Sequence, residues 1–339
     1  MSNAILPMPP YRWQDKVWQE FIDNISADRL PHAMLLTGVA GTGVETLAIA
    51  MGQFLLCQSP MGKISCGRCK SCMLLSSGNH PDMVVISPEE PGKQIKVDEI
   101  RTLADFVGKT SQQGAKKIIV IHPADALNIN AANALLKNLE EPAGDTVFLL
   151  VSSSLSQVLP TIRSRCLKLV LPLPEKHLAE EWLKSVHVEQ PGAILEAAGG
   201  APLLAKSWAD SEYLQERQKL LQSLVALSLS QTTPIETAKV WAKVDLTSII
   251  SNMLYWVEKM IKIRLADEPL AELSELEQAF EGAESGLLFR LRDNLAKKRR
   301  LVQSSSNLNP TLILEELMLD WAAVIRLRAS SMKSHAGFL

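Results

Sequence analysis

Apolar and polar positions follow two periods through the first half of the chain. Five short runs are almost continuously apolar, as is typical of strands buried on both faces of a parallel sheet. These runs cover residues 33–37, 83–86, 117–121, 147–151 and 167–171. Between and before them, apolar residues recur three and four positions apart, which predicts amphipathic helices. The predicted helices cover residues 11–25, 47–56, 97–107 and 131–139. Strands that alternate with helices in this way predict an α/β fold with a parallel sheet.

Beyond Pro172-Leu173-Pro174 only helical patterns remain. Short helices separated by glycines occupy 173–212, and longer ones follow over 213–339. At 339 residues the chain exceeds one ordinary core. We therefore predict three domains: an α/β domain over 1–172, a small helical domain over 173–212 and an all-helical domain over 213–339.

A glycine-rich loop follows the first predicted strand and precedes a helix. Gly38, Gly41 and Gly43 preserve the glycines of a phosphate-binding loop, in which a lysine and a hydroxyl residue normally follow the last glycine. Here Val44 stands at the lysine position and Glu45 at the hydroxyl position that would hold Mg²⁺. The sequence therefore predicts a degenerate phosphate loop without productive ATP binding.

The second half of a nucleotide hydrolase site is also missing. In an active enzyme the strand matching 117–121 ends in acidic residues that hold Mg²⁺ and activate water. His122 and Pro123 occupy those places. A single histidine at a strand end is usually packed or solvated, so we predict no catalytic role for His122.

Four of the five cysteines lie close together in sequence: Cys57, Cys66, Cys69 and Cys72. Such spacing predicts a structural zinc site of four thiolates, which leaves no open position for water. Free thiols, an iron–sulfur cluster and a redox pair are the competing interpretations. The run lacks the ending of ferredoxin-type cysteine motifs, and a redox pair requires only two cysteines. We expect residues 57–72 to form a zinc-binding insertion in the α/β domain.

Composition limits the remaining possibilities. Apolar residues make up 47% of the chain and charged residues 21%, as in soluble globular proteins. Its 35 basic and 37 acidic residues nearly cancel, so no global field attracts nucleic acid. For the basic run 297–300 the two interpretations are contact with DNA phosphates and a solvated helix face, and we predict the solvated face. The chain shows neither a membrane-length apolar run nor a secretory signal, which predicts a cytoplasmic protein.

Several of these motifs together resemble the bacterial clamp-loader subunits of the AAA+ class. The resemblance rests on the glycine loop, the four-cysteine module, the helix 131–142 that ends in Leu-Glu-Glu-Pro, and Ser164-Arg165-Cys166. Because the loop is degenerate, the chain is most similar to the delta-prime type in the DNA polymerase III clamp loader.

The resemblance implies an AAA+ (RecA-like) sheet domain, a helical lid and an oligomerisation collar. It implies gamma/tau and delta subunits as partners, contact with the sliding clamp and primer-template DNA through the complex, and no membrane partner. The chain would have no catalytic activity of its own within the DNA-directed DNA polymerase (nucleotidyltransferase) holoenzyme. Arg165 would act as an arginine finger, in trans, on ATP bound by an adjacent subunit. The alternatives are an active gamma/tau-like ATPase and a zinc-dependent hydrolase.

Overall fold

The computed structural model describes residues 9–90, 93–113, 116–266, 273–281, 283–304 and 309–335. The chain divides into two compact units, Met1–Asp210 and Ser211–Leu339. Each is described by itself below. No described helix is both long enough and apolar enough to cross a lipid bilayer.

The first unit is built on a five-stranded parallel sheet with the order β2-β3-β4-β1-β5. The strands are β1 (Ala33–Gly38), β2 (Met83–Ile86), β3 (Lys117–Ile121), β4 (Thr146–Ser152) and β5 (Leu167–Leu171). The five predicted strands are confirmed, with ends that differ by at most one residue. β1 lies between β4 and β5, so the loop after β1 leaves the sheet between two neighbouring strand ends.

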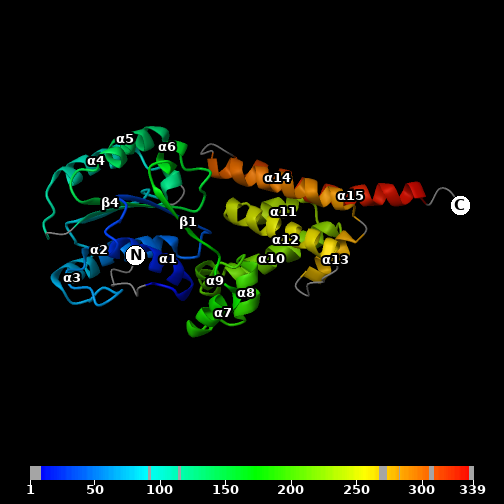
Figure 1. Ribbon diagram of the computed structural model, residues 1–339. Helices are drawn as coiled ribbons and strands as arrows, with labels where there is room; N and C mark the ends of the chain where they lie inside the picture. Colours follow the sequence, from blue (N-terminus) through cyan, green and yellow to red (C-terminus); the bar gives the residue numbers. More distant parts are fainter. Residues whose placement is uncertain are drawn as a thin grey trace. The chain divides into compact units, whose positions relative to one another are not determined.

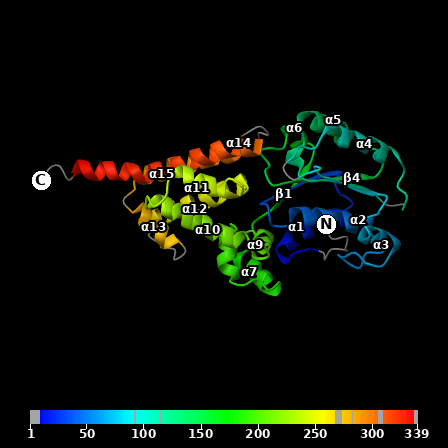
Figure 2. The same ribbon diagram turned by 180° about the vertical axis from the view of Figure 1, so that it is seen from behind.

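Helices cover both faces of this sheet (Figures 1 and 2). α1 (Asp15–Ser26) and α2 (Val44–Leu56) pack on one face. α4 (Val97–Gly108), α5 (Ile129–Glu140) and α6 (Pro160–Arg163) pack on the other. Successive strand residues point to opposite faces, so Met34 and Leu36 join the first core whereas Ala33 and Leu35 join the second. The α/β prediction is therefore correct. The central strands β1, β3 and β4 are buried on both faces, whereas the edge strands β2 and β5 are partly exposed.

Three short helices follow the sheet within the same unit. They are α7 (Lys176–Ser185), α8 (Pro191–Ala197) and α9 (Pro202–Ala209). Ala179, Leu183, Leu195 and Ala205 are buried in a small core that these helices share. The described backbone of the first unit thus holds a small helical module beside the sheet module.

The described residues of the second unit form helices without strands. These are α10 (Tyr213–Ser228), α11 (Pro234–Trp241), α12 (Leu246–Ala266), α13 (Ser274–Phe280), α14 (Ser285–Ser304) and α15 (Pro310–His335). Trp321 lies fully buried at the centre, with Phe280 edge-on at 5.3 Å between ring centroids. The Trp321 Nε1–H donates to Ser228 Oγ at 3.0 Å, so the one polar atom of the ring is paired.

Within the basic run 297–300, Lys297 is exposed as predicted, but Lys298 is not part of a solvated face. Lys298 is buried, and its Nζ pairs with Glu316 on α15 at 2.5 Å. Nearby, Asn294 donates to Asp320, which places a polar cluster between α14 and α15. Neighbouring residues of a helix point in different directions, so Lys298 faces α15 while Lys297 is exposed. The charge of the run alone does not show which of its residues is buried.

Candidate functional site

The glycine loop connects β1 to α2, as the sequence predicts. Gly41 and Gly43 have φ angles of +83° and +84°, which favour glycine. Gly38 is required for a different reason: a Cβ there would lie 2.8 Å from the Leu171 carbonyl oxygen and 2.8 Å from Val44 Cγ2. Val44 is buried, so an apolar side chain stands where a charged lysine would have to reach phosphate.

Side chains from the chain's own N-terminal turn pack against this loop. A 3₁₀ turn, η1 (Arg12–Gln14), precedes α1. Gln14 Nε2 donates to the Gly43 carbonyl at 2.9 Å, and Trp13 Nε1 donates to the Thr42 carbonyl at 2.9 Å. The Tyr11 ring lies against Gly43, where an added Cβ would come within 2.7 Å of Tyr11 Cε2.

The start of α9 contacts the same loop at Gly41. The Leu203 backbone N–H donates to the Gly41 carbonyl at 2.9 Å. A Cβ on Gly41 would lie 2.7 Å from Leu204 Cβ and 3.2 Å from Ala201 Cβ. Because Gly41 and Gly43 have no Cβ, the chain's own residues pack closely against the loop. The N-terminal turn packs against Gly43, and the start of α9 packs against Gly41.

An aromatic group ties the N-terminal turn to α7. Tyr11 and Trp13 stack with centroids 4.8 Å apart and an interplanar angle of 3°. The Trp182 ring meets both edge-on, at 5.6 Å and 5.7 Å. Burial raises the pKa of Tyr11, whose hydroxyl hydrogen bonds with Thr46 on α2. Residues from η1, α2 and α7 thus meet around the loop.

Glu45 and His122 contact each other where a nucleotide hydrolase would hold its metal. Glu45 lies in the first turn of α2 and His122 directly after β3, and Glu45 Oε2 is 3.3 Å from His122 Nδ1. The prediction that His122 is simply packed or solvated missed this partner. Asp125, the nearest acidic residue after β3, accepts a hydrogen bond from Ser152 Oγ. Both carboxylates are therefore engaged by protein groups.

Arg165 lies between α6 and β5, with its side chain 34% exposed. Its Nη1 donates to the Thr161 carbonyl at 3.0 Å and to Ser164 Oγ at 3.4 Å. Its Nη2 donates to Glu140 Oε1 at the end of α5. Adjacent Cys166 is buried, which raises the pKa of its thiol to about 11 and keeps it protonated and unreactive.

The four cysteines predicted as a metal site do converge. The Sγ atoms of Cys57, Cys66, Cys69 and Cys72 all lie within 4.8 Å of one another, and all four residues are free of disulfides. Four sulfurs around zinc at about 2.3 Å stand about 3.8 Å apart, and Cys66 and Cys72 are separated by 4.0 Å. The cluster therefore fits a tetrahedral metal ion.

Backbone N–H groups stabilise thiolates in this cluster. The Cys66 N–H donates to Cys57 Sγ and the Cys69 N–H to Cys66 Sγ, both at 3.3 Å. The N–H groups of Arg68 and Cys69 lower the pKa of the Cys66 thiol to about 6. Burial raises the pKa of Cys57 and Cys72, which ionise readily only beside a cation. This donor set is suited to a metal that binds sulfur.

Hydrogen bonds fix the cysteine module to the rest of the unit. α3 (Lys70–Ser76), which the sequence did not predict, follows its N-cap Cys69 and carries Ser71, whose Oγ lies 2.7 Å from His80 Nε2. The Asp82 N–H donates to His80 Nδ1 at 3.1 Å, so the ring proton is on Nε2 and donates to Ser71. His80 therefore cannot act as a base for Ser71. The trio is a structural link, unlike a hydrolase triad.

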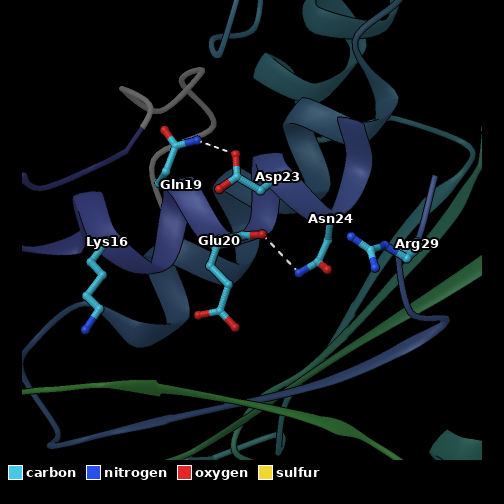
Figure 3. A pocket seen from close by; sticks show the side chains of 6 residues that line it. All are labelled: Lys16, Gln19, Glu20, Asp23, Asn24 and Arg29. Atoms are coloured by element: carbon cyan, nitrogen blue, oxygen red, sulfur yellow. Dashed lines mark hydrogen bonds between the residues drawn. The ribbon is translucent and has the colours of Figure 1, made fainter. Parts of the chain in front are cut away.

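Figure 3 shows a separate hollow over the polar face of α1, lined by Lys16, Gln19, Glu20, Asp23, Asn24 and Arg29. Gln19 Nε2 donates to Asp23 Oδ1 at 2.5 Å, and Asn24 Nδ2 donates to the Glu20 carbonyl at 2.9 Å. These residues carry both charge signs, and four of the six bond in the two pairs just given. The hollow includes none of the residues predicted as site residues.

The sequence missed the residues that pack against the loop. It assigned the apolar positions of 11–25 to a core helix, although Tyr11 and Trp13 contact the loop instead. Gln14 is completely buried immediately before α1, but the sequence shows only a polar residue there and so gives no signal of this burial. Contacts with Trp182 and Leu204 join positions far apart in the chain and leave no short-range pattern.

Comparison with known proteins identifies relatives over nearly the whole chain. The family model described as DNA polymerase III, delta subunit, matches residues 13–175. The model described as DNA polymerase III, delta subunit, C terminal, matches residues 211–323.

Individual relatives agree with these matches. The DNA polymerase III subunit delta' of Pseudomonas aeruginosa is 37% identical over 323 residues, which cover 93% of this chain and 98% of the relative. The subunit delta' of Yersinia pestis is 32% identical over 333 residues, covering 93% and 96%. Among solved structures, a DNA polymerase III gamma subunit-related protein from Thermotoga maritima is 19% identical, with a TM-score of 0.45, and covers 91% of this chain and 98% of its own.

Proposed function

Because the chain belongs to the family of DNA polymerase III delta-prime subunits, we propose that it is a clamp-loader subunit that does not hydrolyse ATP. Its partners are the gamma/tau and delta subunits, with which it supports loading of the sliding clamp onto primed DNA. In this proposal residues 173–212, which contain α7–α9, form the lid domain. The helices of 213–339 form the collar that joins subunits.

The contact between Glu45 and His122 carries the non-hydrolysing part of the proposal. Phosphoryl transfer depends on cations that neutralise charge on the phosphates. Here a carboxylate replaces the metal-binding hydroxyl and lies 3.3 Å from a histidine that replaces the acidic metal ligand. An uncharged, buried Val44 replaces the lysine. An active gamma/tau-like ATPase would need the lysine, the metal-binding hydroxyl and the acidic metal ligand that these three residues replace.

The four cysteines serve as a structural zinc site in this proposal. The four thiolates would close the coordination sphere, which argues against a zinc-dependent hydrolase, since that activity needs an open position for water. Bound zinc would stabilise the local fold of 57–72. Ser71 and His80 then link the module to the start of β2.

Arg165 supplies the functional group that the subunit contributes. Its own unit lacks a working phosphate loop, yet the guanidinium is partly exposed. A planar guanidinium matches the oxygens of a transferring phosphoryl group. We therefore assign Arg165 to ATP bound on the adjacent subunit, where such a group raises turnover by about 10³–10⁵-fold.

The test uses the complex assembled with the gamma/tau and delta subunits of the same organism. Arg165→Ala should leave assembly and zinc content unchanged while removing DNA-stimulated ATP turnover at one neighbouring site and slowing clamp loading. Arg165→Lys should recover little, because an ammonium group lacks the planar fork. An assembled Arg165→Ala complex with full ATPase and loading rates would contradict the proposal. ATP turnover by the isolated chain that is abolished by a loop mutation would contradict the non-hydrolysing role.

A further inference from the structure

The Arg165 guanidinium is held by three acceptors from two segments. Thr161 and Ser164 belong to the α6 segment of Arg165 itself and accept from Nη1. Glu140 is the last residue of α5 and accepts from Nη2. Figure 1 shows α5 and α6 together on the same face of the sheet. Glu140 is thus the one ionic anchor of this arginine among the described residues.

These contacts leave part of the guanidinium available. An arginine has five N–H donors, and the three bonds above involve Nη1 twice and Nη2 once. The Nε–H and the second Nη2–H have no bond to any described residue. Nε and Nη2 form one edge of the planar group, the arrangement that binds two oxygens of a phosphate side by side. Glu140 therefore fixes the group, while the Nε–H and one Nη2–H remain unbonded among the described residues.

The position of Glu140 is otherwise unfavourable. A carboxylate at the C-terminal end of a helix faces the negative end of the helix dipole, and on sequence alone Glu140 is interpreted as solvated surface. Its neighbour Glu141 is exposed at the same helix end; its backbone N–H donates to the Lys137 carbonyl, but its carboxylate pairs with no described residue. Pairing with Arg165 distinguishes Glu140 from Glu141 and offsets the unfavourable position.

We propose that Glu140 is a positioning residue for Arg165, and that it directs the Nε/Nη2 edge towards a phosphoryl group on the adjacent subunit. This inference rests on the proposed role of Arg165 in trans. Without Glu140, the guanidinium keeps its charge but can rotate about its long side chain. Turnover then falls because fewer encounters have the productive orientation, while ATP binding to the neighbour is unaffected.

The test compares Glu140→Ala, Glu140→Gln and the matched control Glu141→Ala in the assembled complex. Glu140→Ala should lower DNA-stimulated turnover at the affected site by about 10- to 100-fold with an unchanged KM for ATP, as expected for a misplaced group. Glu140→Gln keeps an acceptor oxygen and should retain turnover within about two-fold of wild type. Glu141→Ala, which removes the same charge from the same helix end, should behave as wild type.

A second measurement follows Arg165 in the isolated chain. In ¹⁵N-arginine NMR spectra, Glu140→Ala should speed guanidinium rotation and water exchange at Arg165, whereas Glu141→Ala should not. Wild-type turnover by Glu140→Ala, beside slow turnover by Arg165→Ala, would overturn the positioning role and leave the proposed function intact. Wild-type turnover by both variants would overturn both. Equal losses in Glu140→Ala and Glu141→Ala would show a general charge effect and overturn the positioning role.

Discussion

Restoring the missing loop residues should not by itself restore nucleotide binding. The double substitution Val44→Lys and Glu45→Thr supplies the lysine and hydroxyl of a phosphate loop. However, Trp13, Gln14 and Leu203 still donate to loop carbonyls, and the Tyr11 ring still lies against Gly43. A nucleotide that needs the loop to move must first break these contacts.

The hydrogen bonds set the size of the effect. Three such bonds contribute about 1 kcal/mol each, or about 3 kcal/mol together. Each 1.4 kcal/mol changes an equilibrium tenfold. The need to break these three bonds therefore weakens the apparent affinity of the loop for ATP by roughly 100-fold. Adding Tyr11→Ala and Gln14→Ala removes one of these bonds and the ring, and should recover at least about fivefold of the loss.

Binding of a fluorescent ATP analogue measures this difference in the purified chain. The control carries only Tyr11→Ala and Gln14→Ala and should not bind, because Val44 and Glu45 remain. Zinc content and thermal unfolding show that each variant is folded. Equal affinity of the double and quadruple variants would refute the reasoning, because the packing by η1 would then not oppose nucleotide binding.

Two further results are expected. The purified chain should contain about one zinc ion, and chelation should raise hydrogen exchange over 57–72 while β1, β3 and β4 remain protected, since metal binding stabilises the local fold; iron in place of zinc, or loss of protection throughout the sheet, would contradict this. Burial raises the pKa of Asp320 in the folded state above its ordinary value of 3.8. The protonated carboxyl therefore favours folding at low pH, and this contribution to stability is lost as the pH rises through the pKa of the folded state. Asp320→Asn should therefore increase stability relative to wild type more at pH 7 than at pH 4, as measured by urea midpoints, and the opposite trend would contradict the assignment.

The sheet could be predicted because its information is local. Each strand is an almost continuous apolar run, and its ends lie close to turn residues or charge. The runs 83–86, 117–121 and 167–171 match the observed strands at both ends. The four-cysteine cluster was predictable for the same reason, because Cys66 and Cys69 bracket a short turn.

Long-range contacts explain what the sequence did not show. Trp13 has the helical spacing of a core residue, but its indole N–H is committed to Thr42. The pairing of Glu45 with His122 joins the first turn of α2 to the residue after β3, two positions that are distant in the chain. Lys298 belongs to a basic run, yet only its position relative to Glu316 makes it buried. In each case local composition is compatible with several partners, and tertiary packing selects one.

The strand order has a consequence for synthesis on the ribosome. β1 pairs with β4 and β5 and with neither of the two strands that immediately follow it in sequence. Its hydrogen-bonding partner β4 therefore emerges roughly 110 residues later, which takes about 5–20 s at ordinary translation rates. During that interval an apolar strand, flanked by the α1 and α2 segments, has no strand to pair with. The nascent chain is consequently most exposed to aggregation before β4 is made, and slowing translation between residues 40 and 146 should increase its dependence on chaperones.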